Sequence, residues 1–158
     1  MSQEEGHGKA ERRGYILIIL SVVILDQLSK YLIKTRLGFG SFPLIDNLLY
    51  ITIVRNTGAA FGMFKDTNFL LTIITVILIV FALRYLLISR GKLLGIALSL
   101  IVGGAVGNLI DRIMLGHVVD FIDVNYWPVF NIADSAVSIG IAILIYCIIR
   151  KQNHLTQR

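Results

Sequence analysis

Acidic side chains in the last third of the chain carry the sharpest chemical signal. Asp120 lies in the segment Val118-Val-Asp-Phe-Ile122, and Asp134 lies in Phe130-Asn-Ile-Ala-Asp-Ser135. Two carboxyl groups that share one site do not both ionise easily, so one can stay protonated as an acid while the other activates water. Such a pair is sufficient to hydrolyse a peptide bond. These residues therefore predict the chemistry of an aspartic peptidase.

A structural interpretation of Asp134 stays open beside the catalytic one. Asn131 followed three residues later by Asp134 resembles a capping box at the start of a helix. A carboxylate in the first turn of a helix is also held ionised by the helix dipole, which suits a general base, so the two roles are compatible. If the segment around Asp120 is extended, Asp123 points to its opposite face. We expect Asp123 to be a solvated loop carboxylate.

Other ionisable residues lie inside apolar segments, where a charged side chain costs about 2.5–3.5 kcal/mol and needs a partner or a wet cavity. Asp26 and Lys30 share one helical face, and so do Asn108, Asp111 and Arg112. The first two form either a local ion pair or part of a substrate site. We expect Asp111 to be structural, and we expect Arg112 to meet a group on another helix or a substrate carbonyl.

Other catalytic schemes fit the sequence less well. It contains no HExxH motif, and His7, His117 and His154 are too far apart to form a local zinc motif. It contains no GxSxG elbow. Ser29 and Lys30 are neighbours on a helix and do not face each other, which disfavours a serine–lysine dyad.

The elements that position these residues follow from composition. Of the 158 residues, 56% are hydrophobic and 16% are charged, whereas soluble domains have about 45–50% and about 25%. The apolar residues form blocks long enough to cross a bilayer. We therefore predict an all-α membrane protein, a single integral membrane domain over 1–158, built as a four-transmembrane-helix bundle with spans at about 14–37, 68–88, 93–115 and 132–149.

The polar segments between the spans carry further expectations. Residues 1–13 are too polar to fold alone and predict a flexible cytoplasmic tail. Within the loop 38–67, Leu49-Tyr-Ile-Thr-Ile-Val54 is typical of a strand and predicts a small extracytoplasmic β-cradle. The following stretch, Asn56 to Gly62, is rich in small residues that permit close approach of another chain. Gly103 to Gly107 forms a small-xxx-small pattern that indicates helix packing.

Flanking charges predict the orientation of the bundle. Four spans place both termini on one side, and the basic residues flanking the spans concentrate at that side: Lys9, Arg12, Arg13, Arg90, Lys92, Arg150 and Lys151. By the positive-inside rule, both termini are cytoplasmic, and the aspartates face outward. The net charge of +5 does not indicate nucleic acid, because the bases are not interleaved with aromatic residues.

The motifs also resemble those of a known family. The chain closely resembles the lipoprotein signal peptidases (signal peptidase II) in five segments that appear in the family's order: Asp26-Gln-Leu-Ser-Lys30, Arg55-Asn-Thr-Gly-Ala-Ala-Phe-Gly62, Gly103-Gly-Ala-Val-Gly-Asn-Leu-Ile-Asp-Arg112, Val118-Val-Asp-Phe-Ile122 and Phe130-Asn-Ile-Ala-Asp-Ser135. The resemblance implies a multi-pass aspartic endopeptidase of the bacterial cytoplasmic membrane. Such an enzyme removes the signal peptide from a prolipoprotein, N-terminal to a cysteine that carries a diacylglyceryl group.

The resemblance also implies roles for individual residues. Asp120 and Asp134 would be the catalytic pair. The substrate site would be lined or braced by Asp26, Lys30, Asn56, Gly58, Asn108, Arg112, Asn131 and Ala133. It implies no metal and no cofactor. The expected partners are prolipoprotein substrates, membrane lipids and globomycin-type peptide inhibitors, with the enzyme as a monomer.

Two other functions stay open from the residues alone. A small proton-coupled transporter would use Asp26 near mid-depth of the membrane to exchange protons. This alternative explains buried charge but not its clustering at one end of the spans. A non-catalytic assembly factor would tolerate substitution of either Asp120 or Asp134.

Overall fold

The structure is a computed structural model that describes residues 2–37, 40–58, 68–89 and 91–156. Helices dominate these residues, and four of them contain segments that are long and apolar enough to cross a membrane. They are α1 (Ser2–Arg36), α2 (Asn68–Ile88), α3 (Lys92–Leu115) and α4 (Ile132–Thr156). Together with a small three-stranded sheet, they confirm the predicted fold class.

Two helices extend further than hydropathy alone predicts. Helix α1 begins at Ser2, so residues 2–13 are helical and differ from the flexible tail that their composition predicts. Helix α4 continues to Thr156, past the predicted end of its span at residue 149. Adding a residue to an existing helix is far easier than nucleating one, so an apolar span can extend a helix into polar sequence.

Helix α3 is the centre of the bundle because its glycines let other backbones approach closely. A Cβ added at Gly103 would lie 2.9 Å from Val22 Cβ on α1. A Cβ at Gly104 would collide with the carbonyl oxygen of Ala133 on α4. On α4, Gly140 packs against α3 in the same way, since a Cβ added there would lie 2.8 Å from the carbonyl oxygen of Ala97. The predicted packing role of the Gly103 to Gly107 pattern is confirmed.

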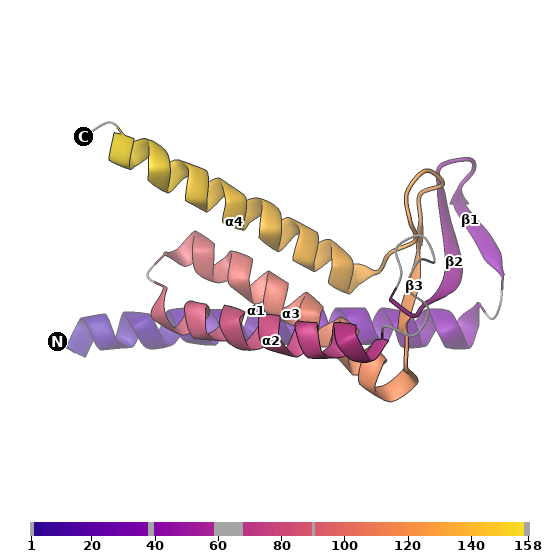
Figure 1. The fold of residues 1–158 in the computed structure, drawn as a ribbon, viewed down its shortest axis with the longest axis horizontal. Helices are drawn as coiled ribbons and strands as arrows, with labels where there is room; N and C mark the ends of the chain where they lie inside the picture. Colours follow the sequence, from indigo (N-terminus) through magenta and orange to yellow (C-terminus); the bar gives the residue numbers. More distant parts are fainter. Residues whose placement is uncertain (1, 38–39, 59–67, 90, 157–158) are drawn as a thin grey trace.

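Helix α2 lies along α3 and has no buried residue (Figure 1). Its two threonine side chains are hydrogen-bonded within the helix. The hydroxyls of Thr72 and Thr75 donate to carbonyl oxygens one turn back, each at 2.7 Å. This helix therefore presents a broad apolar surface suited to lipid.

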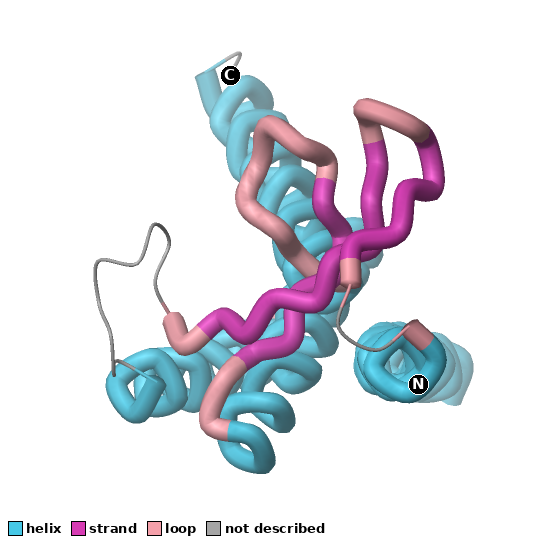
Figure 2. Tube along the Cα trace, turned by 90° about the vertical axis from the view of Figure 1, so that its right-hand side faces the viewer, coloured by secondary structure: helices cyan, strands magenta, loops and turns pink. Residues whose placement is uncertain are grey.

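The three strands form one antiparallel sheet in the order β1 (Ser41–Ile45), β2 (Leu49–Asn56) and β3 (Val118–Asp123). The predicted strand at Leu49 to Val54 lies within β2. The strands run across the ends of the helices, and Figure 2 looks onto this end of the bundle, here called the sheet end (Figure 1, Figure 2). Strand β3 follows α3 in the chain but pairs with β2, which places Asp120 opposite Val54.

Candidate active site

Asp120 is positioned by strand β3 and is almost fully buried, with 1% of its surface exposed. Its Oδ1 accepts a hydrogen bond from Asn131 Nδ2 at 2.6 Å, and its Oδ2 accepts one from Asn56 Nδ2 at 2.9 Å. Asp123, the last residue of the strand, is half-buried and accepts the backbone N–H of Asn125 at 3.0 Å. Asp123 is thus less buried than Asp120, but it lies at the end of a strand and not in the solvated loop that we expected.

Asp134 is positioned by the first turn of α4. The N–H of Asp134 donates to Asn131 Oδ1 at 2.8 Å, and the N–H of Asn131 donates to Asp134 Oδ2 at 3.3 Å. These reciprocal bonds confirm the predicted capping box. The cap does not occupy the whole carboxylate, because Oδ1 of Asp134 accepts a separate bond from Asn108 Nδ2 at 2.7 Å.

Asn131 contacts both aspartates: its side chain donates to the carboxyl group of Asp120 and accepts the backbone N–H of Asp134, and its own N–H donates to the carboxyl group of Asp134. It is completely buried, and its Nδ2 lies within hydrogen-bond distance of Asp120 Oδ1, Asn108 Oδ1 (3.1 Å) and the Val119 carbonyl (3.4 Å). An amide nitrogen has two hydrogens, so these three acceptors share them. One short polar side chain therefore contacts both Asp120 and Asp134 and holds them in the same small region.

A group of ion-paired residues, one lysine between two aspartates, lies directly beside this pair. Lys30 Nζ is 2.8 Å from Asp26 Oδ2, 2.9 Å from Asp111 Oδ2 and 3.1 Å from Asn108 Oδ1. An ammonium has three hydrogens, so all of them are used. The predicted Asp26–Lys30 ion pair is confirmed, and Asp111 has the structural role that we expected.

The two carboxylates of this group also hold the backbone that carries the aspartate pair. Asp26 Oδ1 accepts the N–H of Ala133 at 3.0 Å, and Asp111 Oδ2 accepts the N–H of Val119 at 3.0 Å. Ala133 directly precedes Asp134, and Val119 directly precedes Asp120. Each supporting carboxylate therefore fixes the position of one member of the pair.

Gln27 belongs to this support and was missed by sequence reasoning. Its Nε2 is 3.1 Å from Asp26 Oδ2, from Asp111 Oδ1 and from the carbonyl oxygen of Gly107. It thereby connects α1 to α3 beside the ion pairs. The signal that could have identified it was its place next to Asp26 in the first motif.

Asp120 is easier to protonate than an ordinary aspartate. Burial raises the pKa of this carboxyl group to about 6, and the nearby carboxyl of Asp134 adds to the rise. Hydrogen bonds from the amides of Asn56 and Asn131 and the charge of Lys30 act in the opposite direction but do not cancel it. A carboxyl group with such a pKa exchanges a proton near neutral pH, as a general acid or base must.

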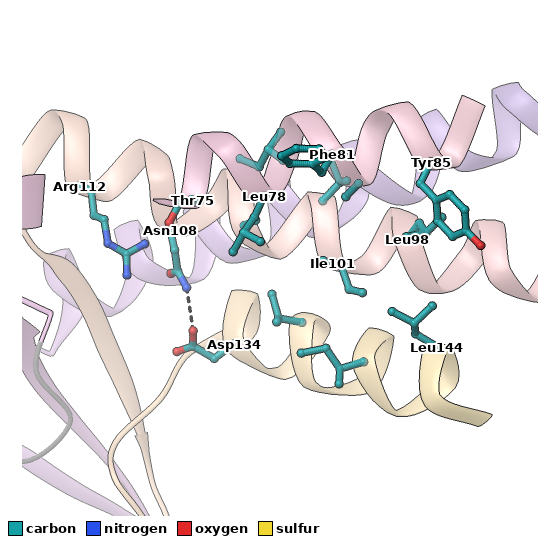
Figure 3. A pocket seen from close by; sticks show the side chains of 16 residues that line it. Thr75, Leu78, Phe81, Tyr85, Leu98, Ile101, Asn108, Arg112, Asp134 and Leu144 are labelled. Atoms are coloured by element: carbon teal, nitrogen blue, oxygen red, sulfur yellow. Dashed lines mark hydrogen bonds between the residues drawn. The ribbon is translucent and has the colours of Figure 1, made fainter. Parts of the chain in front are cut away.

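An apolar groove of about 690 Å³ leads to Asp134 between α2, α3 and α4. Figure 3 shows Phe81, Ile101 and Leu144 along it, with Asn108, Arg112 and Asp134 at one end. Among the described residues, the guanidinium of Arg112 makes no hydrogen bond or ion pair, so the protein partner that we expected for it is not seen there. The groove thus joins a long apolar surface to a cation and a carboxylate.

Gly58 lies beside the site on the segment that follows β2. Its N–H donates to Asn56 Oδ1 at 2.9 Å, and its φ of 111° is a conformation that favours glycine. The same Asn56 side chain donates to Asp120, so Asn56 links the backbone of Gly58 to the carboxyl group of Asp120. Residues 59–62, the rest of the predicted small-residue stretch, lie outside the described residues.

Comparison with known proteins gives the same fold and the same type of enzyme. Residues 18–150 match the model of a family described as signal peptidase (SPase) II. A lipoprotein signal peptidase of Halothermothrix orenii is 45% identical over 131 residues, which cover 82% of this chain and 90% of that protein. The family model matches most of the chain. The identity to this relative is high enough to show that the two proteins belong to one family.

Two solved structures agree with this result. A bacterial membrane enzyme determined by the in meso method at 2.3 Å resolution has a TM-score of 0.83 and 38% identity, covering 89% of this chain and 90% of its own. Another, at 1.9 Å resolution, has a TM-score of 0.79 and 39% identity, covering 85% and 92%.

Fold and site define a multi-pass membrane peptidase of the aspartic type. The chain belongs to the signal peptidase II family, whose members cleave signal peptides from prolipoproteins. This assignment replaces the transporter and the assembly factor as functions of the chain.

Proposed function

We propose that Asp120 and Asp134 are the catalytic pair and that the enzyme cuts N-terminal to a cysteine carrying a diacylglyceryl group. The observation that carries this proposal is Asn131, whose buried side chain hydrogen-bonds to both aspartates. The raised pKa of Asp120 supports a pair that holds one proton between two carboxyl groups.

The chemistry follows from that shared proton. One carboxylate deprotonates a water molecule, which attacks the carbonyl carbon preceding the modified cysteine. The protonated partner donates to the carbonyl oxygen, giving a tetrahedral intermediate. Its collapse breaks the C–N bond: the carboxyl group that took a proton from water gives it to the leaving nitrogen, and the other carboxylate takes back a proton from a hydroxyl of the intermediate.

The surrounding residues divide into two roles. Asn56, Asn108 and Asn131 hold the carboxyl groups of the pair through their side-chain amides. The support formed by Asp26, Lys30 and the N–H of Ala133 holds the start of α4. Arg112 and Gly58 are left to contact substrate, the former through its guanidinium in the groove and the latter through close approach of its backbone.

A lipid-modified substrate suits the apolar groove between α2, α3 and α4. Such a substrate lies in the bilayer and has to reach the aspartates sideways, and this groove ends at Asp134. Globomycin-type peptides would compete for the same space. The arrangement is complete within one chain, which agrees with a monomeric enzyme formed by a single membrane domain.

The orientation of the bundle follows from its charges and its shape. The start of α1 and the end of α4 lie at the end of the bundle opposite the sheet (Figure 1). Basic residues flank the spans at that end, so both termini are cytoplasmic and the active site lies at the extracytoplasmic face of the bacterial inner membrane.

The decisive test is processing of a purified diacylglyceryl-modified precursor by Asp120→Asn and Asp134→Asn variants. Each substitution removes a group that moves a proton, so we expect each to lower kcat by about a hundred- to ten-thousand-fold. Thermal unfolding should show that both variants stay folded.

Asp123→Asn is the matched control, since this aspartate lies on the same strand and bonds to Asn125 instead. It should process the precursor at nearly the wild-type rate. Normal cleavage by either Asp120→Asn or Asp134→Asn would show that the catalytic assignment is wrong.

A further inference from the structure

A second cavity, separate from the substrate groove, lies between α1 and α3 at the sheet end. Its volume is about 410 Å³, and it shares no lining residue with the groove. Its walls include Tyr31, Lys34 and Thr35 from α1, Met114 and Leu115 from α3, and Val119 from β3. We call it the α1–α3 pocket.

The charge exposed at the rim of the α1–α3 pocket is positive. Lys30 and Asp111 also line the pocket, but both are buried, and Lys30 is ion-paired with Asp26 and Asp111. The side chain of Lys34 is exposed at its rim and, within the described part of the chain, has no hydrogen bond or ion pair. The rim of the pocket at Lys34 therefore favours an anionic group.

The surface beside this cation is apolar. Met114 is 75% exposed, and Leu115 is also exposed. On α1, Tyr31 continues into an exposed apolar stripe at three- and four-residue spacing, formed by Leu28, Ile24, Leu20 and Leu17. A cation at the head of a long apolar stripe matches a ligand with an anionic head and a hydrocarbon chain.

The depth of Lys34 fits such a ligand. The membrane-spanning part of α1, Glu11–Arg36, has 26 residues, and at a rise of 1.5 Å per residue it is about 39 Å long. A bilayer has a hydrocarbon core of about 30 Å, so a residue near the end of this helix lies among the lipid headgroups. The flexible stem of a lysine can adjust its ammonium to that level.

We propose that the α1–α3 pocket binds an anionic phospholipid of the phosphatidylglycerol type, with its phosphate at Lys34 and an acyl chain along the α1 stripe. The bound lipid contacts Val119, whose N–H is held by Asp111 and which precedes Asp120. It is a permanent neighbour of the site and not a substrate, because the substrate groove lies elsewhere.

Native mass spectrometry tests this proposal without reference to catalysis. The protein is released from micelles that contain equal amounts of phosphatidylglycerol and phosphatidylcholine with identical acyl chains. We expect the wild type to retain phosphatidylglycerol preferentially and Lys34→Gln to lower that preference about fivefold, the effect of one lysine near an anionic lipid. Arg36→Gln, which removes a charge close by on α1 but outside the pocket, should keep the wild-type preference.

A second variant tests the apolar half of the pocket. Met114→Trp places a larger side chain in the cavity at an exposed position, so the fold should be unaffected and phosphatidylglycerol should be lost although Lys34 is present. Three results would each overturn the proposal: no lipid preference in the wild type, equal loss in Lys34→Gln and Arg36→Gln, or wild-type retention in Met114→Trp.

Discussion

Two pairs of carboxylates lie side by side at the sheet end and differ in what holds them. Asp26 and Asp111 share the ammonium of Lys30, at 2.8 and 2.9 Å. Asp120 and Asp134 are instead held by asparagine amides, at 2.6 to 2.9 Å. Asn108 lies between the two groups, accepting from Lys30 and donating to Asp134.

The two kinds of partner suit two different roles, which are holding the backbone in place and transferring protons. The burial cost of a carboxylate that is paired with a cation is offset only while the pair is intact. A buried carboxyl group held by neutral amides keeps the ability to gain and lose a proton, which burial brings closer to neutral pH in Asp120. In this enzyme the ion-paired residues hold the backbone, and the amide-held pair is the one that we propose to be catalytic.

Removing Lys30, the cation that Asp26 and Asp111 share, should have the largest effect on stability. Lys30→Met leaves Asp26 and Asp111 buried without their partner, so we expect a loss of about 3–5 kcal/mol in the free energy of unfolding. The measurement is thermal or denaturant unfolding in detergent micelles. Asp26→Asn should cost less, because Lys30 keeps Asp111 and the asparagine oxygen can still accept the N–H of Ala133. Equal losses in the two variants would contradict the idea of a shared cation.

Disrupting the link between the two aspartates should affect rate more than stability. Asn131→Ala removes an N-cap, which costs about 0.5–2 kcal/mol, and also removes the amide that holds Asp120. Because small misplacements of catalytic groups are costly, kcat should fall by up to about a hundredfold, with a smaller change in KM.

Asn125→Gly is the matched control for this prediction, because Asn125 has a φ of 66°, which glycine adopts without strain. Its side-chain amide donates to the carbonyl of Asn47 at 3.2 Å, at the exposed edge of the sheet. It should leave both kcat and stability near their wild-type values. If Asn131→Ala lowers only the melting temperature, with normal kcat for the folded enzyme, Asn131 is a helix cap and nothing more.

The smallest but most specific effect should be a shift in the pH dependence of kcat/KM when Asn56 is replaced. A pair that needs one proton loses activity as pH rises through the pKa of about 6 of Asp120. The amide of Asn56 favours the ionised form of this carboxyl group, so Asn56→Ala should raise its pKa and move the alkaline limb to higher pH. A limb that stays in place, or moves to lower pH, would exclude this role of the amide.

The same pKa predicts how stability depends on pH. The pKa of Asp120 is raised in the folded protein above its ordinary value of about 4. The folded state therefore binds more protons than the unfolded state between about pH 4 and 6, and the contribution of Asp120 to stability falls as pH rises through this range. Asp120→Asn should remove that part of the slope when unfolding is followed at several pH values.

Local features of the molecule were predictable from the sequence. The bounds of α2 match the prediction because its 21 residues are long and apolar enough to specify a span alone. The Asp26–Lys30 pair and the Asn131–Asp134 cap were also predictable, since their members are three or four residues apart. The helical start of α1 was not, because composition does not show how far a helix extends beyond its apolar core.

By itself, therefore, the sequence determined the spans, the cap and the types of residue available for catalysis, since each depends on neighbours along the chain. Only the tertiary structure decided that β3 pairs with β2, that Asp111 shares Lys30 with Asp26, and that Gln27 connects α1 to α3. These contacts join residues far apart in the chain, and their distances depend on how closely the glycines of α3 let α1 and α4 approach.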